Sequence, residues 1–322
     1  MGSVTWPQVP GKRPQNCKLG PKFNAIFMKK HQMFVAALLS SALLPQISQA
    51  QVMAPAAPVA ANMSEADIKA LGEGIAFPYE KLDSVLRETV DKEGNVFYSK
   101  IKGRNDLETF VRAVAIADLT KFPKWMVPSD PKDPKSKEKP DQFPELAFYI
   151  NAYNGLFLKA VGDEYPIRSL GDIKGLDTEK TRVVAGQSYS FADLRRKIAE
   201  IDPRALFCLP DGTNAGPRAS SGVFRYTGLD QQLNAAISSF VNDVTRVTPP
   251  VRLENKVSVS PWMQTVDEYF GTKGGRSKWN GIKSLLVSYT TRNSDQGYLS
   301  AGDYQVAFLP ADKSVNEART RP

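Results

Sequence analysis

The order of apolar and polar positions along the chain predicts a fold that is mostly helical. Apolar residues recur at helical spacing in 105–119 and again in 229–244. The segment 144–165 is apolar on nearly every face, which is typical of a helix buried at the centre of a domain. Further helices are expected in four other segments: 78–90, 191–201, 262–270 and 278–291.

Strand patterns are fewer and shorter than helical ones. They predict a small hairpin over 182–190, a short buried strand at 204–209, and strands or extended segments at 95–101, 251–260 and 304–310. The Pro-, Lys- and Asp-rich run 128–143 predicts a solvated loop. Helices outnumber strands and do not alternate regularly with them. We therefore expect an α+β fold, a mostly helical single domain around a small, largely antiparallel sheet.

The first fifty residues have the pattern of an export signal. Basic residues after Met28 precede an apolar stretch from Phe34 to Leu44, and small residues precede Gln51. We predict that 28–50 is a signal peptide cleaved near Ala50 and that 1–27 is a non-native or mis-called extension. Low-complexity residues 51–63 are expected to form a flexible linker, with one α+β domain over 64–322. The protein is then periplasmic or secreted, and its apolar run is too short to span a membrane.

Removal of this leader changes the charge balance. Residues 1–50 hold six of the 42 Lys and Arg and none of the 34 Asp and Glu, so 36 basic side chains remain against 34 acidic ones. No strongly basic field is left to attract a polyanion, which argues against nucleic acid as a partner.

Histidine and cysteine are nearly missing from the predicted mature chain. His31 is the one histidine of the sequence and lies in the signal, and Cys17 lies in the leader. This excludes Cys–His and Ser–His–Asp catalysis and zinc sites built from His and Cys. We expect no metal site and no cofactor. The remaining Cys208 lies in an apolar run and is expected to be a small buried hydrophobe.

Five motifs follow one another along the chain: "LAFYINAYNGLFLKAVGDEYPIRSLGDI" (146–173), "GQSYSFADLRRKI", "DPRALFCLPDGTNAGP", "VSVSPWMQTVDEYF" and "LPADKSVNE". In sequence and in order, across 95–318, they resemble the domain-of-unknown-function family 547, known from exported bacterial proteins, plants and worms. The family's two cysteines fall on Asp211 and Gly216, and its histidines on Leu206 and Arg196. The resemblance implies a site whose thiol and imidazole groups are replaced in this chain.

Carboxylates and amides remain as candidate site residues. Asp211, Asp193 and Asp312 lie in the family-like motifs, and two of them could converge as an acid–base pair. The other candidates are Asn151, Tyr153 and Asn154, which either line a cleft or tether loops to the helix, and Asn214 in the loop after Cys208.

Three functions are compatible with these residues. The first is a non-catalytic domain that binds a peptide, a cell-envelope component or a protein partner in the former cleft. The alternative is a hydrolase or acyl transferase that uses the candidate carboxylates, with or without a divalent metal. The third is a purely structural envelope protein, for which a surface without a pocket near Asp211 would be the sign.

Overall fold

The computed structural model describes residues 77–130, 133–271 and 278–318, which belong to one compact unit. This part of the chain is mostly helical with short strands, which confirms the α+β fold class. Its α-helices are α2 (Tyr79–Thr89), α3 (Asn105–Ile116), α4 (Phe143–Glu164), α5 (Phe191–Ile201), α6 (Leu229–Asn242), α7 (Asp267–Phe270), α8 (Asn280–Tyr289) and α9 (Asn293–Ala301). The predicted signal peptide and linker lie outside the described residues.

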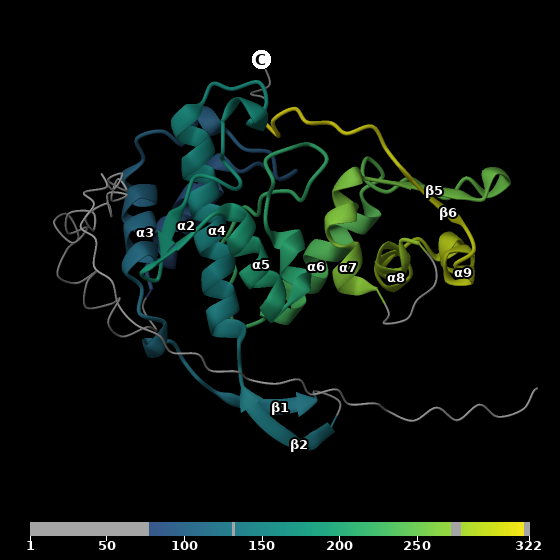
Figure 1. Cartoon of the computed structure of the whole chain (residues 1–322), viewed down its shortest axis with the longest axis horizontal. Coiled ribbons are helices and arrows are strands. Elements are labelled where there is room, and N and C mark those ends of the chain that lie inside the picture. Colours follow the sequence, from purple (N-terminus) through teal and green to yellow (C-terminus); the bar gives the residue numbers. More distant parts are fainter. Residues whose placement is uncertain (1–76, 131–132, 272–277, 319–322) are drawn as a thin grey trace, which may run out of the picture. The chain divides into compact units, whose positions relative to one another are not determined.

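Helix α4 forms the centre of the hydrophobic core, as its apolar sequence predicts. It packs against α2 and α3 on one side and α5 on the other (Figure 1). Buried side chains occur on all of its faces. Neighbouring segments pack closely against the backbone of α4, since a Cβ atom at Gly162 would overlap Cγ2 of Ile101. Among the described helices, none is both long and apolar enough to cross a bilayer.

The described strands form separate two-stranded sheets rather than one. Strands β1 (Met126–Asp130) and β2 (Asp133–Pro140) pair antiparallel, as do β3 (Arg182–Val184) and β4 (Gln187–Tyr189). Strands β5 (Lys256–Val259) and β6 (Gln305–Phe308) pair in parallel. The largely antiparallel character agrees with the expectation. The pairs remain apart, so the core is organised by α4 and not by a sheet.

The prediction of a loop without secondary structure over 128–143 is wrong, although the expected exposure to solvent is found. Most of this segment belongs to the β1–β2 hairpin, which Figure 1 shows extending away from the helices. Its side chains are largely exposed, including those of Lys135, Lys137 and Lys139. Because neither face of the hairpin is buried, the sequence lacks the apolar alternation by which strands are recognised.

The strand predicted at 204–209 is a 3-10 helix, Pro203–Cys208. Its burial is as expected, since it packs between α5 and α6. Asp202 caps it by accepting a hydrogen bond from the backbone N–H of Arg204, and Pro203 occupies its first position. Short apolar runs fit a buried strand and a buried helical turn equally well. Similar 3-10 turns replace part of three other predictions: Tyr98–Lys100 lies within 95–101, Arg252–Glu254 lies within 251–260, and Pro261–Thr265 overlaps the first part of 262–270.

Candidate functional site

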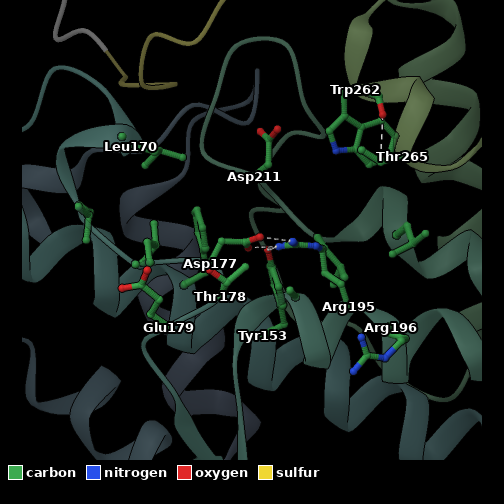
Figure 2. A pocket seen from close by; sticks show the side chains of 18 of the residues that line it. Tyr153, Leu170, Asp177, Thr178, Glu179, Arg195, Arg196, Asp211, Trp262 and Thr265 are labelled. Atoms are coloured by element: carbon green, nitrogen blue, oxygen red, sulfur yellow. Dashed lines mark hydrogen bonds and ion pairs between the residues drawn. The ribbon is translucent and has the colours of Figure 1, made fainter.

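A cavity of about 850 Å³ lies beside α4 and α5. Tyr153 on α4 and Arg195 on α5 line it, together with Asp177 from the segment between α4 and β3. Asp211 comes from the loop after the 3-10 helix Pro203–Cys208, and Trp262 from the 3-10 helix before α7. These residues come from separate parts of the chain and meet at one cavity (Figure 2).

Arg195 links two of these side chains. Its Nη1 and Nη2 donate to the two carboxylate oxygens of Asp177, at 2.6 and 2.7 Å, and Nη1 also lies 3.2 Å from the hydroxyl of Tyr153 (Figure 2). Such a two-point contact fixes the guanidinium plane. The Tyr153 ring is buried and stacks on Phe157, with ring centroids 5.8 Å apart. Burial raises the pKa of Tyr153 to about 12, although nearby Arg195 opposes the rise.

Asp211 lies on the other side of the same cavity. In Figure 2 its carboxyl group stands apart from the Arg195–Asp177 pair, between Leu170 and Trp262. One oxygen, Oδ1, accepts hydrogen bonds from the backbone N–H and the hydroxyl of Thr213, both at 2.9 Å. Burial nevertheless raises the pKa of Asp211, with Thr213, Arg195 and Arg246 acting in the opposite direction. Asp211 is therefore a desolvated carboxylate that faces a cavity.

The loop that carries Asp211 is held from behind by buried groups. Arg246, with 1% exposure, donates from Nε to the carbonyl of Gly216 at 2.9 Å and from Nη2 to that of Asn214 at 3.1 Å. The hydroxyl of Ser260 donates to the carbonyl of Ala215 at 2.7 Å. These bonds satisfy loop carbonyls that would otherwise be buried without partners, and they hold residues 214–216 of the loop in place.

Asp211 and Gly216, where the resembling family has cysteines, are in contact. A Cβ atom built on Gly216 would overlap both Oδ1 and Cγ of Asp211. The carboxyl group of Asp211 thus occupies the space that a side chain at 216 would take. A side chain at 216 would therefore require the Asp211 carboxyl group to move from this position.

We predict that the double substitution Asp211→Cys/Gly216→Cys forms a disulfide on mild oxidation. The two side chains would begin within disulfide reach, and closing so short a loop is worth about 2 kcal/mol of stability. Peptide mapping after alkylation under denaturing conditions should find residues 211 and 216 linked. Free thiols at both positions after oxidation would show that the loop is arranged differently.

Asp193 and Asp312 do not join Asp211. Asp193 is in the capping box of α5: its Oδ2 accepts from the hydroxyl of Ser190 at 2.6 Å, and its Oδ1 pairs with Arg196. Asp312 accepts from the backbone N–H of Ser314 at 3.0 Å and from the hydroxyl of the same residue. These hydrogen bonds lower the pKa of both carboxyl groups. Neither is among the described residues that line the cavity.

The asparagine candidates lie outside the cavity lining. Asn151 is fully buried and tethers a loop, since its amide donates to the carbonyl of Phe224 at 2.7 Å and accepts from the N–H of Phe224 at 2.9 Å. Asn154 is buried, and its Oδ1 has no partner among the described residues. Asn214 donates from Nδ2 to the hydroxyl of Ser314 at 2.9 Å. Of the proposed binding residues, Tyr153 alone lines the cavity.

Cys208 is 2% exposed, and burial raises its pKa. Its neighbours Leu206 and Leu209 line the large cavity, while Cys208 does not. Within the described residues, no group of three or more His, Cys, Asp or Glu is placed to hold a metal ion.

Asp177, Arg195, Glu179 and Glu268 also line the cavity, and sequence reasoning missed them. Arg195 lies in an ordinary amphipathic helix, and Asp177 in a charged loop. Their pairing joins segments 18 residues apart that the helical pattern alone does not bring together.

Replacing Asp211 with asparagine is expected to raise the melting temperature at pH 7 and to change it little near pH 4. Because the pKa of Asp211 is raised in the folded chain, the unfolded chain ionises first as pH rises, and the folded state loses stability until the folded carboxyl ionises too. An asparagine side chain cannot ionise and avoids this loss. Thermal unfolding between pH 4 and 8 tests it, with exposed Asp303→Asn as control. A constant difference between wild type and Asp211→Asn would contradict it.

The comparisons with known proteins agree with the motifs. Residues 139–241 match the model of the family described as "Protein of unknown function, DUF547". This range includes α4, α5, all but the last residue of α6, and the loop that carries Asp211. No curated protein and no solved structure was found to match the chain. The chain is therefore similar to the DUF547 family over residues 139–241.

Proposed function

We propose that this protein is an exported, non-catalytic binding domain whose large cavity takes a peptide, with a cationic group of the peptide beside Asp211. The observation that carries the proposal is a desolvated carboxylate that faces a cavity of about 850 Å³. A cavity of this size accommodates several residues of a peptide.

The charges of the cavity favour a cation. Arg195 is paired with Asp177, and Arg196 reaches back to Asp193 outside the lining. What remains is Lys174 against three carboxylates, namely Asp211, Glu179 and Glu268. A positively charged side chain or amino group would offset this excess and the cost of burying Asp211.

Apolar groups beside these charges favour a peptide over a small inorganic cation. Phe157 and Leu170 line the cavity near Asp211, and Trp262 and Tyr269 supply aromatic surface. Tyr269 is 38% exposed, so its ring is accessible to a ligand. Pockets that combine aromatic surface with a few fixed polar groups are typical of specific ligand sites.

The residue set favours binding over acyl transfer. A thiol or hydroxyl nucleophile needs a base of suitable pKa, most often histidine. The one histidine of the sequence is His31, and Cys208 is buried with a raised pKa. Asp211 stands where the resembling family has a cysteine.

A panel of fluorescein-labelled hexapeptides that differ only in a central Lys, Gln or Glu tests the proposal. We expect the Lys peptide to bind at least tenfold more tightly than the Glu peptide in fluorescence anisotropy at pH 7. Asp211→Asn should remove most of this preference, whereas Asp303→Asn, on the exposed surface, should retain it. Equal binding of all three peptides, or no binding at all, would contradict the proposal.

The acid–base alternative rests on the same carboxylate. A raised pKa suits a proton-transferring group, and the Tyr153 hydroxyl lines the same cavity. Because Asp193 and Asp312 lie elsewhere, Asp211 would act without either of them. Hydrolysis of fluorogenic ester or amide substrates that Asp211→Ala abolishes would favour this alternative. The hypothesis of a purely structural envelope protein expects a surface without a pocket near Asp211, whereas Asp211 lines a cavity.

A further inference from the structure

A second cavity, of about 310 Å³, lies between α6 and the segment that follows the Asp211 loop. Its lining includes Arg218 and Arg246, with Ser239 and Gln232 from α6. Arg218 and Arg246 are not among the residues that line the large cavity. The second cavity therefore has its own set of polar groups.

Arg218 is held in place by neutral groups. Its Nη1 donates to Oδ1 of Asn95 at 2.7 Å and to Oδ1 of Asn214 at 3.3 Å. Arg218 makes no ion pair within the described part of the chain. Its charge makes only a small contribution to the lowered pKa of Asp312. A guanidinium that is oriented by amide oxygens keeps its full charge and its remaining N–H donors.

A second guanidinium increases the positive charge of this cavity. Arg246 is buried and pairs with Asp243, which also lines the cavity. The pKa of Arg246 is lowered, first by burial and then by the charge of Arg218. The cavity lining thus holds two arginines and one carboxylate, and because Asp243 pairs with Arg246 alone, an excess of one positive charge remains.

Two neutral residues with hydrogen-bond donors, Gln232 and Ser239, line the same cavity. Gln232 uses its Oε1 to accept from the N–H of Arg225, at 3.0 Å, which leaves its amide nitrogen as a donor. Ser239 is exposed on α6 and contributes a hydroxyl. Arginine, amide and hydroxyl donors around one cavity are the groups that bind carboxylates and phosphates.

We propose that this cavity is an oxyanion-binding site, in which Arg218 takes the carboxylate or phosphate group of a small ligand. Nη2 and Nε of Arg218 have no hydrogen bond within the described residues, and they would provide the two-point contact that such a group prefers. Arg246 contributes positive charge, and three of its N–H groups donate to Gly216, Asn214 and Asp243. This proposal does not rest on peptide binding at Asp211.

Calorimetric titration of the full chain with inorganic phosphate and, separately, with succinate tests the site. We expect saturable binding of at least one of them, with a dissociation constant on the order of 1 mM, and the stronger of the two identifies the ligand class. Ser239→Asp places a carboxylate in the cavity without removing either arginine, and should weaken binding about tenfold or more. Ser239→Ala is the matched control and should bind nearly as wild type.

Arg218→Gln should also abolish binding, whereas Arg87→Gln, on an exposed residue of α2, should not. Circular dichroism checks that each variant is folded. Absence of saturable binding by the wild type to both probes, or equal binding by Ser239→Asp and Ser239→Ala, would overturn the proposal.

Discussion

Replacing Asn151 with leucine is expected to lower the free energy of unfolding by about 3 kcal/mol. The Asn151 amide bonds both the N–H and the carbonyl of Phe224, and its Nδ2 also donates to the carbonyl of Ala147 at 2.9 Å. Leucine is similar in size but leaves the two backbone groups of Phe224 buried without partners. Urea unfolding, followed by circular dichroism, measures the change.

Asn154→Leu is a matched control on the same helix. Asn154 is also buried, but its Oδ1 has no partner among the described residues. Its replacement therefore removes fewer hydrogen bonds than that of Asn151. We expect a loss below about 1 kcal/mol. Equal losses for the two variants would show that the Asn151–Phe224 tether is not what makes Asn151 important.

Ending the chain at Ala311 should lower the free energy of unfolding by about 4 kcal/mol. The segment that is lost, from residue 312 onward, forms hydrogen bonds to the Asp211 loop and to the turn after α2. Asn316, with 0% exposure, donates its N–H to the carbonyl of Gly212, accepts at its carbonyl from Val96, and accepts at Oδ1 from the hydroxyl of Tyr98, each at 2.9 Å. The N–H of Ala318 donates to the carbonyl of Val96, also at 2.9 Å.

The same truncation is expected to weaken peptide binding, because the Asp211 loop loses the backbone bonds of Gly212 and Asn214 to this segment. A chain that ends at Ala318 keeps these bonds and should match the full chain in urea unfolding. If the chain ending at Ala311 unfolded at the same urea concentration as the full chain, the segment would contribute nothing to the fold.

The central elements of the fold can be predicted from local sequence because their signals are local. Helix α4 is apolar on all faces, which indicates burial in any context. Helix α5 begins at a capping box between Ser190 and Asp193, a pattern contained within four residues. The β3–β4 hairpin has Ala185 and Gly186 at its turn, both with positive φ, and is closed by three paired positions.

Other elements could not be predicted because their cause is not local. Strands β5 and β6 pair across almost fifty residues of sequence, and their parallel register depends on the helices between them. Helix α9 was missed because its sequence has little apolar periodicity; Asp295 and Leu299 are its buried residues. The charged β1–β2 hairpin offers no apolar alternation at all.

The candidate site was found in part. Tyr153 and Asp211 were identified because both lie in motifs of the family, and the fold brings them to one cavity. The sequence position of Asp193 fits a catalytic acid and a helix cap equally well. The hydrogen bond from Ser190 shows that Asp193 caps the helix. Arg195 and Asp177 carry no local signal, since their pairing depends on how α5 meets the segment before β3.

A double-mutant cycle between Asp211 and the central lysine of the bound hexapeptide tests the central claim most directly. The affinities of wild type and Asp211→Asn for the Lys and Gln peptides give the coupling between the two charges. If the peptide cation lies beside Asp211, each single change weakens binding about tenfold and the two together cost little more than either alone. Fully additive losses, with no coupling, would contradict the account.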